Sequence, residues 1–404
     1  RRLRYASNVV YLWETGRRWP TPAGFFWLAH RTGCDVEAAL GPLARAPLAE
    51  AKAIRRLDGV QTLSASIGFQ IADRDRLSTT PGPLVVERLV DSMVALAGTG
   101  LTIVIGETLE PSARRLEALG VGRMRYTMLL TDDGGIIDDL MVTRREQDLF
   151  LVVNGACKQG DVAHMREHLP ADVVLEELTS QALVALQGPQ AEQALARLNP
   201  AVADMKFMTA QAMELDGISC FVSRSGYTGE DGYEISVLDE DADRLCRRLL
   251  DMDEVAPIGL GARDSLRLES GLCLYGHDID TTTSPAEAVL MWSISKRRRA
   301  EANFPGAERI LSEVANGPSR KRVGLLALGK APIREGAEIQ TKDGETVGVV
   351  TSGGFGPTVE RPVAMGYVAA GHTAEDTELQ AIVRGRPQPV VVRKMPFITQ
   401  NYKR

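Results

Sequence analysis

Two adjacent aspartates lie inside an apolar stretch, residues 136–143, whose composition predicts a β-strand. Aspartate is depleted in strands, and neighbouring strand residues face opposite sides, so Asp138 and Asp139 each share a face with apolar residues. Such surroundings disfavour the ionised carboxylate unless a partner is present. A structural ion pair and a functional carboxylate, able to stabilise positive charge or handle a proton, both remain open.

A glycine-rich run, Ser225-Gly226-Tyr227-Thr228-Gly229-Glu230-Asp231-Gly232, precedes a predicted strand that carries Glu234. Strand alternation places Glu234 on the face opposite Tyr233 and Ile235. Its carboxylate could accept two hydrogen bonds from a heterocycle that presents an amino group beside a ring N–H. A solvent-exposed glutamate is the alternative. The glycines suit either a hairpin loop or a loop that bends close to a ligand.

Cations occur in two places where they could bind anions. Arg263 and Arg267 are one helical turn apart, with Asp264 and Glu269 as available partners. Their guanidinium groups suit carboxylate or ring acceptors, although a solvated helix face is equally consistent with the spacing. Further along lie four consecutive cations, Lys296, Arg297, Arg298 and Arg299. Such a cluster is typical of a solvated surface, and it also suits an anionic partner.

Composition narrows the class of protein. The chain has 404 residues, 44% hydrophobic and 25% charged, which predicts two or three domains of an ordinary soluble protein. Its formal net charge of -6 argues against nucleic-acid binding. No apolar run approaches the roughly 18 residues of a membrane helix, so we expect no membrane partner.

Cysteine and histidine usage predicts neither disulfides nor a metal site. Five scattered cysteines, never spaced as Cys-x-x-Cys, indicate reduced thiols in a reducing compartment. His164 and His168 are four residues apart, but the nearest thiol, Cys157, fits no metal-site spacing. We therefore predict a polar helix surface there and no metal.

The elements that must position these residues follow from hydrophobic periodicity. Three antiparallel strands are predicted at residues 126–130, 136–143 and 149–154, followed by a helix near 161–167. Later elements are strands at 182–189, 218–224 and 232–237 and helices at 242–250 and 262–269. From about Arg322, short strands with glycine-rich turns predict a small barrel.

The N-terminal part follows a different pattern. A helix near residues 84–96 and an apolar strand at 101–105 are predicted. No GxxxxGK[ST] phosphate-binding loop occurs, which makes an ATPase an unlikely class.

Several motifs together resemble the aminomethyltransferase family, the T-protein of the glycine cleavage system. The runs 225–235 and 259–269, in this order and separation, resemble its folate-binding core, and the run 134–142 resembles its catalytic strand. The runs 291–299 and 304–307 resemble mitochondrial and related bacterial members. The resemblance covers roughly residues 119–404, and the N-terminal third does not match.

This resemblance implies an α+β fold of the T-protein-like folate-binding type, with antiparallel sheets and a C-terminal small β-barrel. It implies three segments. Residues 1–118 form an anomalous N-terminal region of uncertain fold, residues 119–318 form the folate-binding aminomethyltransferase domains, and residues 319–404 form the C-terminal barrel domain.

The resemblance also implies roles for individual residues. Asp139 is the expected catalytic residue, beside the reacting folate nitrogens. The expected folate ligands and pocket residues are Glu234, Arg263, Tyr402, Tyr126 and Asn154. The cations Lys296, Arg297, Arg298 and Arg299 are expected to receive an acidic carrier protein or the glutamate tail of folate.

The implied reaction transfers the methylene of an aminomethyl group, carried on lipoylated H-protein, to tetrahydrofolate as co-substrate, with release of ammonia and without metal or flavin. Two alternatives stay open: a folate-dependent demethylase of the same superfamily, and a non-catalytic or degenerate folate-binding protein. The absence of a GxGxxG segment argues against a full flavin dehydrogenase. The expected location is the cytoplasm of a bacterium or the mitochondrial matrix of a eukaryote.

Overall fold

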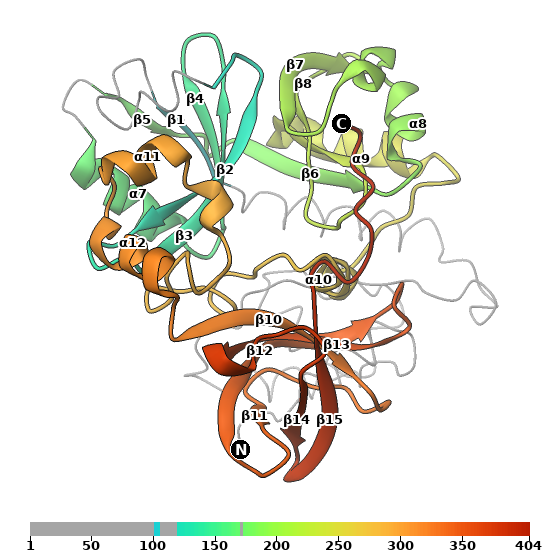
Figure 1. Ribbon diagram of the computed structural model, residues 1–404. Helices are drawn as coiled ribbons and strands as arrows, with labels where there is room; N and C mark the ends of the chain where they lie inside the picture. The colour runs from blue at the N-terminus through green and yellow to red at the C-terminus, as the bar shows by residue number, and fades with distance from the viewer. Residues whose placement is uncertain (1–100, 106–118, 170–172) are drawn as a thin grey trace, which may run out of the picture.

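The computed structural model describes the backbone of residues 101–105 and all of residues 119–169 and 173–404. Within these residues lie two open antiparallel sheets, a closed barrel and several short helices (Figure 1). The predicted fold class, antiparallel sheets with a C-terminal small barrel, is confirmed. The helix expected near residues 84–96 lies outside the described residues.

The first sheet has five strands in the order β2-β3-β4-β1-β5. Their bounds are β1 Leu101–Ile105, β2 Met124–Leu130, β3 Ile136–Arg144, β4 Leu149–Val153 and β5 Leu175–Glu177. Helix α7, Lys158–His168, buries Val162 and Met165 against Leu140 and Leu151 of this sheet.

Strand β1 coincides with the predicted apolar strand at residues 101–105. These residues belong to the predicted N-terminal region, residues 1–118. The strand pairs with β4 and β5 on its two sides. The sheet therefore begins upstream of residue 119, and a boundary at 118 separates strands that are hydrogen-bonded to each other.

The second sheet has four strands in the order β6-β9-β8-β7. Their bounds are β6 Gln181–Gln187, β7 Thr209–Leu215, β8 Ile218–Arg224 and β9 Gly232–Leu238. Helices α8, Ala191–Ala196, and α9, Asp239–Leu250, pack on one face and complete a hydrophobic core. A 3-10 turn, η2, Pro200–Asp204, follows α8.

The segment between α9 and the first barrel strand joins this core to the barrel. Helix α10, Leu260–Glu269, packs on the barrel strands and lies centrally in Figure 1. After it come the 3-10 turn η3, Met291–Ser293, and helices α11, Lys296–Glu301, and α12, Ala307–Asn316. In the described residues no helix has both the length and the apolar character needed to span a membrane.

The closed barrel follows the order β10-β13-β12-β11-β14-β15. Its strands are β10 Arg320–Ala327, β11 Glu338–Gln340, β12 Thr346–Gly356, β13 Arg361–Ala369, β14 Glu378–Val383 and β15 Arg386–Arg393, with a 3-10 turn η4 at Ala370–His372. Alternate residues such as Leu325, Ile339 and Ala381 are completely buried inside it. Closure pairs both edges of the sheet.

The C-terminal residues leave the barrel and return to the four-stranded sheet (Figure 1). The Asn401 backbone N–H donates to the Gly229 carbonyl at 3.1 Å, and the Phe207 N–H donates to the Lys403 carbonyl at 2.7 Å. These bonds hold the chain end in place, although terminal residues commonly fray.

Candidate functional site

Asn154 joins the two adjacent aspartates of strand β3. Its Nδ2 group donates to Oδ1 of Asp138 and to Oδ1 of Asp139, each at 2.9 Å, and its backbone N–H lies 3.3 Å from Oδ2 of Asp138. Strand register explains the contact, because Met141 pairs with Val152, and continuing two residues along each strand brings Asn154 opposite Asp139. Asp138 is fully buried and Asp139 half-buried.

The surroundings of Asp139 tune its acidity. Burial and the nearby charge of Asp138 raise the pKa of Asp139 to about 6, while hydrogen bonds from Tyr126 and Asn154 act in the opposite direction. A carboxyl group that titrates near neutral pH can both stabilise positive charge and exchange a proton. These surroundings fit a functional carboxylate, one of the two alternatives that its strand position left open.

Tyr126 connects Asp139 to a cavity. Burial, with the Asp139 charge as the next cause, raises the pKa of Tyr126, so its hydroxyl stays a neutral donor toward Asp139. Its ring lies 5.2 Å from that of Trp292, centroid to centroid, and Trp292 is 66% exposed. Sequence reasoning gave no role to Trp292, because its contact depends on how η3 packs beside β2.

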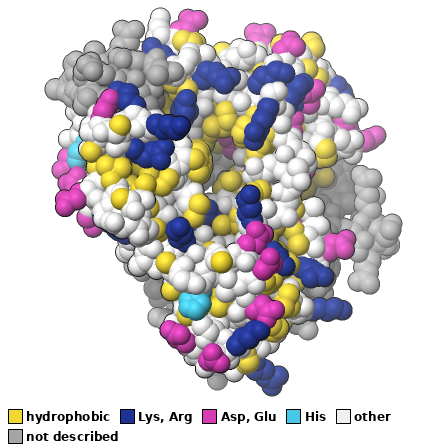
Figure 2. All heavy atoms as spheres, in the orientation of Figure 1, with side chains coloured by type: hydrophobic (Ala, Val, Ile, Leu, Met, Phe, Trp, Pro, Cys, Tyr) yellow, Lys and Arg dark blue, Asp and Glu magenta, His cyan; other side chains and the backbone are white. Residues whose placement is uncertain are grey.

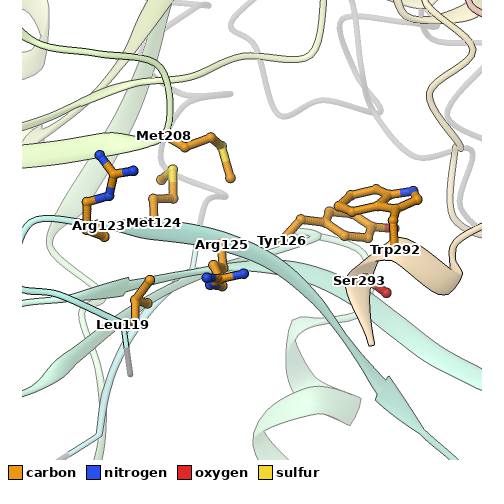
Figure 3. A pocket seen from close by; sticks show the side chains of 8 residues that line it. All are labelled: Leu119, Arg123, Met124, Arg125, Tyr126, Met208, Trp292 and Ser293. Atoms are coloured by element: carbon orange, nitrogen blue, oxygen red, sulfur yellow. The ribbon is translucent and has the colours of Figure 1, made fainter. Parts of the chain in front are cut away.

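The cavity beside these rings has a volume of about 280 Å³. Figure 3 shows the Tyr126 and Trp292 rings at one end and Arg123, Met124 and Met208 at the other. Its complete lining is Leu119, Arg123, Met124, Arg125, Tyr126, Met208, Trp292 and Ser293. The mixture of apolar surface and cations suits an elongated ligand with an anionic group.

Arg263 contacts Tyr227, a residue of the glycine-rich run. The exposed Arg263 guanidinium lies 4.6 Å from the centroid of the Tyr227 ring, a cation–π contact. Burial raises the pKa of Tyr227, and the charges of Asp139 and Arg263 act on it in opposite directions. The Tyr227 hydroxyl donates to the carbonyl of Cys273. Tyr227 thus contacts the predicted arginine and interacts electrostatically with the predicted carboxylate, a relation that the sequence did not reveal.

Glu234 lies half-buried on β9, on the face opposite the fully buried Tyr233 and Ile235, as the alternation predicted. Its Oε2 accepts a hydrogen bond from the Ser225 hydroxyl at 2.9 Å. Ser225 in turn lies 2.7 Å from the hydroxyl of Ser223. Glu234 is therefore fixed at one oxygen by the loop that precedes its strand.

That loop, residues 225–231, is called the site loop below. Gly229 has φ +79°, and a Cβ added there would lie 1.9 Å from Oγ of Ser270. A Cβ on Gly226 would lie 1.8 Å from Oε1 of Gln187. Both glycines are thus needed for close packing of the site loop against protein atoms.

Tyr402 stacks on Phe207, with ring centroids 3.9 Å apart and an interplanar angle of 10°. The neighbouring Asn401 bonds to the site loop, because its Nδ2 donates to Oε1 of Glu230 at 2.7 Å and its N–H to the Gly229 carbonyl. Burial raises the pKa of Tyr402.

The predicted site residues thus fall into two groups. Asp139, Tyr126 and Asn154 are in direct contact. Glu234 and Arg263 contact the site loop through Ser225 and Tyr227, and Asn401, the neighbour of Tyr402, bonds to the Gly229 carbonyl of the same loop. Because Tyr227 also interacts electrostatically with Asp139, the site loop lies near both groups.

The four adjacent cations are not equivalent in helix α11. Lys296 and Arg297 are exposed, and Arg297 pairs with Glu301 at 3.4 Å. Arg298 instead donates to the Asn303 carbonyl at 2.6 Å and is partly buried. Figure 2 shows Lys and Arg side chains gathered around a central hollow of this face. In the described part of the chain, no group of three or more His, Cys, Asp or Glu residues is placed to hold a metal ion.

Two antiparallel sheets that carry the predicted site residues and a closed C-terminal barrel together define the class of fold. The GCVT N-terminal domain family matches residues 110–298, and the glycine cleavage T-protein C-terminal barrel domain family matches residues 320–398. The chain belongs to the glycine cleavage T-protein family. Residues 1–109 lie outside both matched ranges.

Individual relatives agree with this family. The chain is 42% identical over 297 residues to the mitochondrial aminomethyltransferase of Mesembryanthemum crystallinum, covering 71% of this chain and 72% of that protein. It is 40% identical over 307 residues to that of Dictyostelium discoideum, covering 72% and 76%. The crystal structure of the glycine cleavage system aminomethyltransferase T from Bartonella henselae matches with a TM-score of 0.71 at 39% identity, covering 76% of this chain and 86% of that one.

Proposed function

We propose that this chain is an aminomethyltransferase that moves the methylene of an aminomethyl group from lipoylated H-protein to tetrahydrofolate and releases ammonia. The observation that carries the proposal is Asp139, a carboxylate held by Tyr126 and Asn154 with a pKa near 6. The names of the relatives, aminomethyltransferases at 40–42% identity, support the same activity.

Asp139 acts by charge and by proton handling. As ammonia departs, positive charge develops on the methylene carbon, and a fixed carboxylate beside it lowers the energy of that state. With a pKa of about 6, Asp139 is mainly ionised at neutral pH and can still take up a proton transiently. Its bonds to Tyr126 and Asn154 hold the carboxylate in place before the reaction.

Glu234, Arg263 and Tyr402 bind the folate. Among the described residues the Arg263 N–H groups have no hydrogen-bond acceptor, and stacking on Tyr227 leaves their edge open to a ligand. Glu234 uses one oxygen for Ser225 and keeps acceptor capacity for a pterin amino group and ring N–H. Tetrahydrofolate supplies the nucleophilic nitrogen that accepts the methylene.

The carrier docks near α11, where Lys296 and Arg297 are exposed and Trp292 lies just upstream. The transferred carbon keeps the oxidation level of formaldehyde throughout, so the proposed reaction requires no flavin. For a eukaryotic source, the mitochondrial relatives favour the mitochondrial matrix.

The test is a product assay with purified chain, aminomethylated lipoylated H-protein and tetrahydrofolate. We expect ammonia and 5,10-methylenetetrahydrofolate in equal amounts. Turnover with a methylated amine such as sarcosine, but none with the carrier, would establish a demethylase instead. Folate binding without either reaction would establish a non-catalytic binding protein.

A further inference from the structure

Asp161, in the first turn of α7, is a buried carboxyl group without a donor. It is 1% exposed, and within the described residues neither of its oxygens meets an N–H or hydroxyl group. The group it faces is the carboxyl of Asp138, which is fully buried. Two carboxylates in contact away from water cannot both ionise without a large cost, so the pair must share a proton or be neutralised by a cation.

The surroundings favour a proton over a cation. The titratable groups that interact with Asp161 are Asp138 and Asp139 on β3, Cys157 before α7, and Tyr275 after α10. None of these is a cation. The described residues also contain no cluster placed to hold a metal ion.

Hydrogen bonding decides which carboxyl holds the proton. Asp138 accepts from the Asn154 side chain at 2.9 Å and from its backbone N–H at 3.3 Å. Bonds of this kind stabilise the ionised form of Asp138. Asp161 receives no such bond, so the proton is more stable on Asp161.

We propose that Asp161 retains a proton and donates it in a hydrogen bond to Asp138, which keeps Asp138 ionised and holds the Asp138–Asn154–Asp139 contact in one geometry. Burial and the contact with Asp138 raise the pKa of Asp161 to about 8, in agreement. Asp161 touches no predicted ligand position and is a positioning residue for Asp139. The effect on turnover rests on the proposed function, whereas the retained proton does not.

Infrared spectroscopy of the whole chain tests the proton directly. At pH 7 we expect a protonated carboxyl band in the wild type that is lost in Asp161→Asn, whose amide donates to Asp138 in the same way. The control is Glu167→Gln, an exposed change on the same helix, which should keep the band. A wild type without the band, or a band that persists in Asp161→Asn, overturns the proposal.

The pH dependence of stability gives a second readout. A folded-state pKa raised from the ordinary aspartate value to about 8 contributes stability at low pH that is lost as pH rises through this range. The Tm of Asp161→Asn minus that of the wild type should therefore increase by a few degrees as the pH rises from about 4 to about 8. A constant difference across this range contradicts a retained proton, and Glu167→Gln should show no trend.

Measurements of turnover distinguish the effect of the hydrogen-bond donor on Asp161 from the effect of its shape. Asp161→Leu removes the donor, and we expect kcat to fall roughly tenfold, part of the ~10²-fold that a positioned carboxylate supplies. KM for tetrahydrofolate should stay unchanged, and Asp161→Asn should keep the wild-type kcat. Equal losses in both variants overturn the positioning role. If the wild type shows no turnover, the proposed function fails, and the infrared and Tm results still decide the proton.

Discussion

At the scale of single residues, the chemistry of this chain depends on how Asp139 is surrounded. Burial and the charge of Asp138 raise its pKa, and hydrogen bonds from Tyr126 and Asn154 lower it, which leaves a value of about 6. The sequence revealed the unusual pair of aspartates within a strand. It could not reveal the contact of Tyr227 with Arg263 or that of Trp292 with Tyr126, because those contacts join elements far apart in the chain.

The acid limb of the pH–rate profile should move in opposite directions in two variants. Activity requires ionised Asp139 and should fall as pH drops through about 6. Tyr126→Phe removes a donor to the ionised form, raises the pKa of Asp139 and moves the limb to higher pH. Asp138→Asn removes a like charge and moves it to lower pH. A limb that stays fixed in both variants would assign the titration to another group.

Removing a ligand group should weaken folate binding without unfolding the chain. We expect Glu234→Gln and Arg263→Ala each to cost roughly 1–3 kcal/mol in tetrahydrofolate binding, as for other losses of a charged hydrogen-bond partner. Calorimetry measures the affinity, and Arg244→Ala, on α9 at the surface, is the control. Unchanged affinity in a folded variant would make that residue structural.

At the scale of elements, one buried arginine fixes helix α10 to the barrel. Arg267 donates to Oδ2 of Asp278 at 2.7 Å and to Oγ of Ser352 on β12 at 2.9 Å. The sequence predicted α10 and the neighbouring partner Asp264, and both were found. The other predicted partner, Glu269, instead accepts backbone N–H groups from Thr358 and Val359. Long-range partners cannot be read from helical spacing.

Strand β7 shows a second reason why an element can escape prediction from the sequence. It was not predicted, although Asp216 and Gly217 both have positive φ, 51° and 72°, the turn that an Asp-Gly pair favours between two strands. All residues of β7 except Ala210 and Leu215 are exposed or half-buried. This edge strand therefore carries too little hydrophobic signal to stand out.

Breaking the α10 contact should destabilise the fold. Asp278→Asn leaves the Arg267 charge buried without its full partner, and we expect a loss of about 3–5 kcal/mol. Asp264→Asn removes a partner that is 54% exposed and should cost at most about 1 kcal/mol. Urea denaturation compares the two variants. Equal losses would show that exposure does not set the strength of these ion pairs.

At the scale of the whole molecule, the C-terminal residues connect the barrel to the four-stranded sheet and to the site loop. The barrel follows from short strands with glycine turns, so it was predictable. The return of Tyr402 to the site loop was inferred only by family resemblance, since nothing in its local sequence specifies a distant partner. For the same reason, the pairing of β1 with β4 and β5 across residue 118 could not be read from the sequence.

The positive charges exposed on α11 should raise the rate at which the carrier associates with this chain. Replacing Lys296 and Arg297 together by Gln should slow H-protein association and flatten its salt dependence, because surface charges act mainly on encounter rates. Arg298 is left intact because it bonds to the Asn303 carbonyl. The control double variant is Lys330→Gln with Lys342→Gln, on the barrel. Stopped-flow traces with the same rate and salt slope as the wild type would place the docking surface elsewhere.

The most direct test of the whole account replaces one oxygen of Asp139. Asp139→Asn keeps the shape and removes the charge, so single-turnover assays should show a loss of ~10²-fold or more in methylene transfer, while calorimetry shows nearly unchanged tetrahydrofolate binding. Wild-type turnover in Asp139→Asn, or a loss explained entirely by weaker folate binding, would contradict the assignment of Asp139 as the catalytic carboxylate.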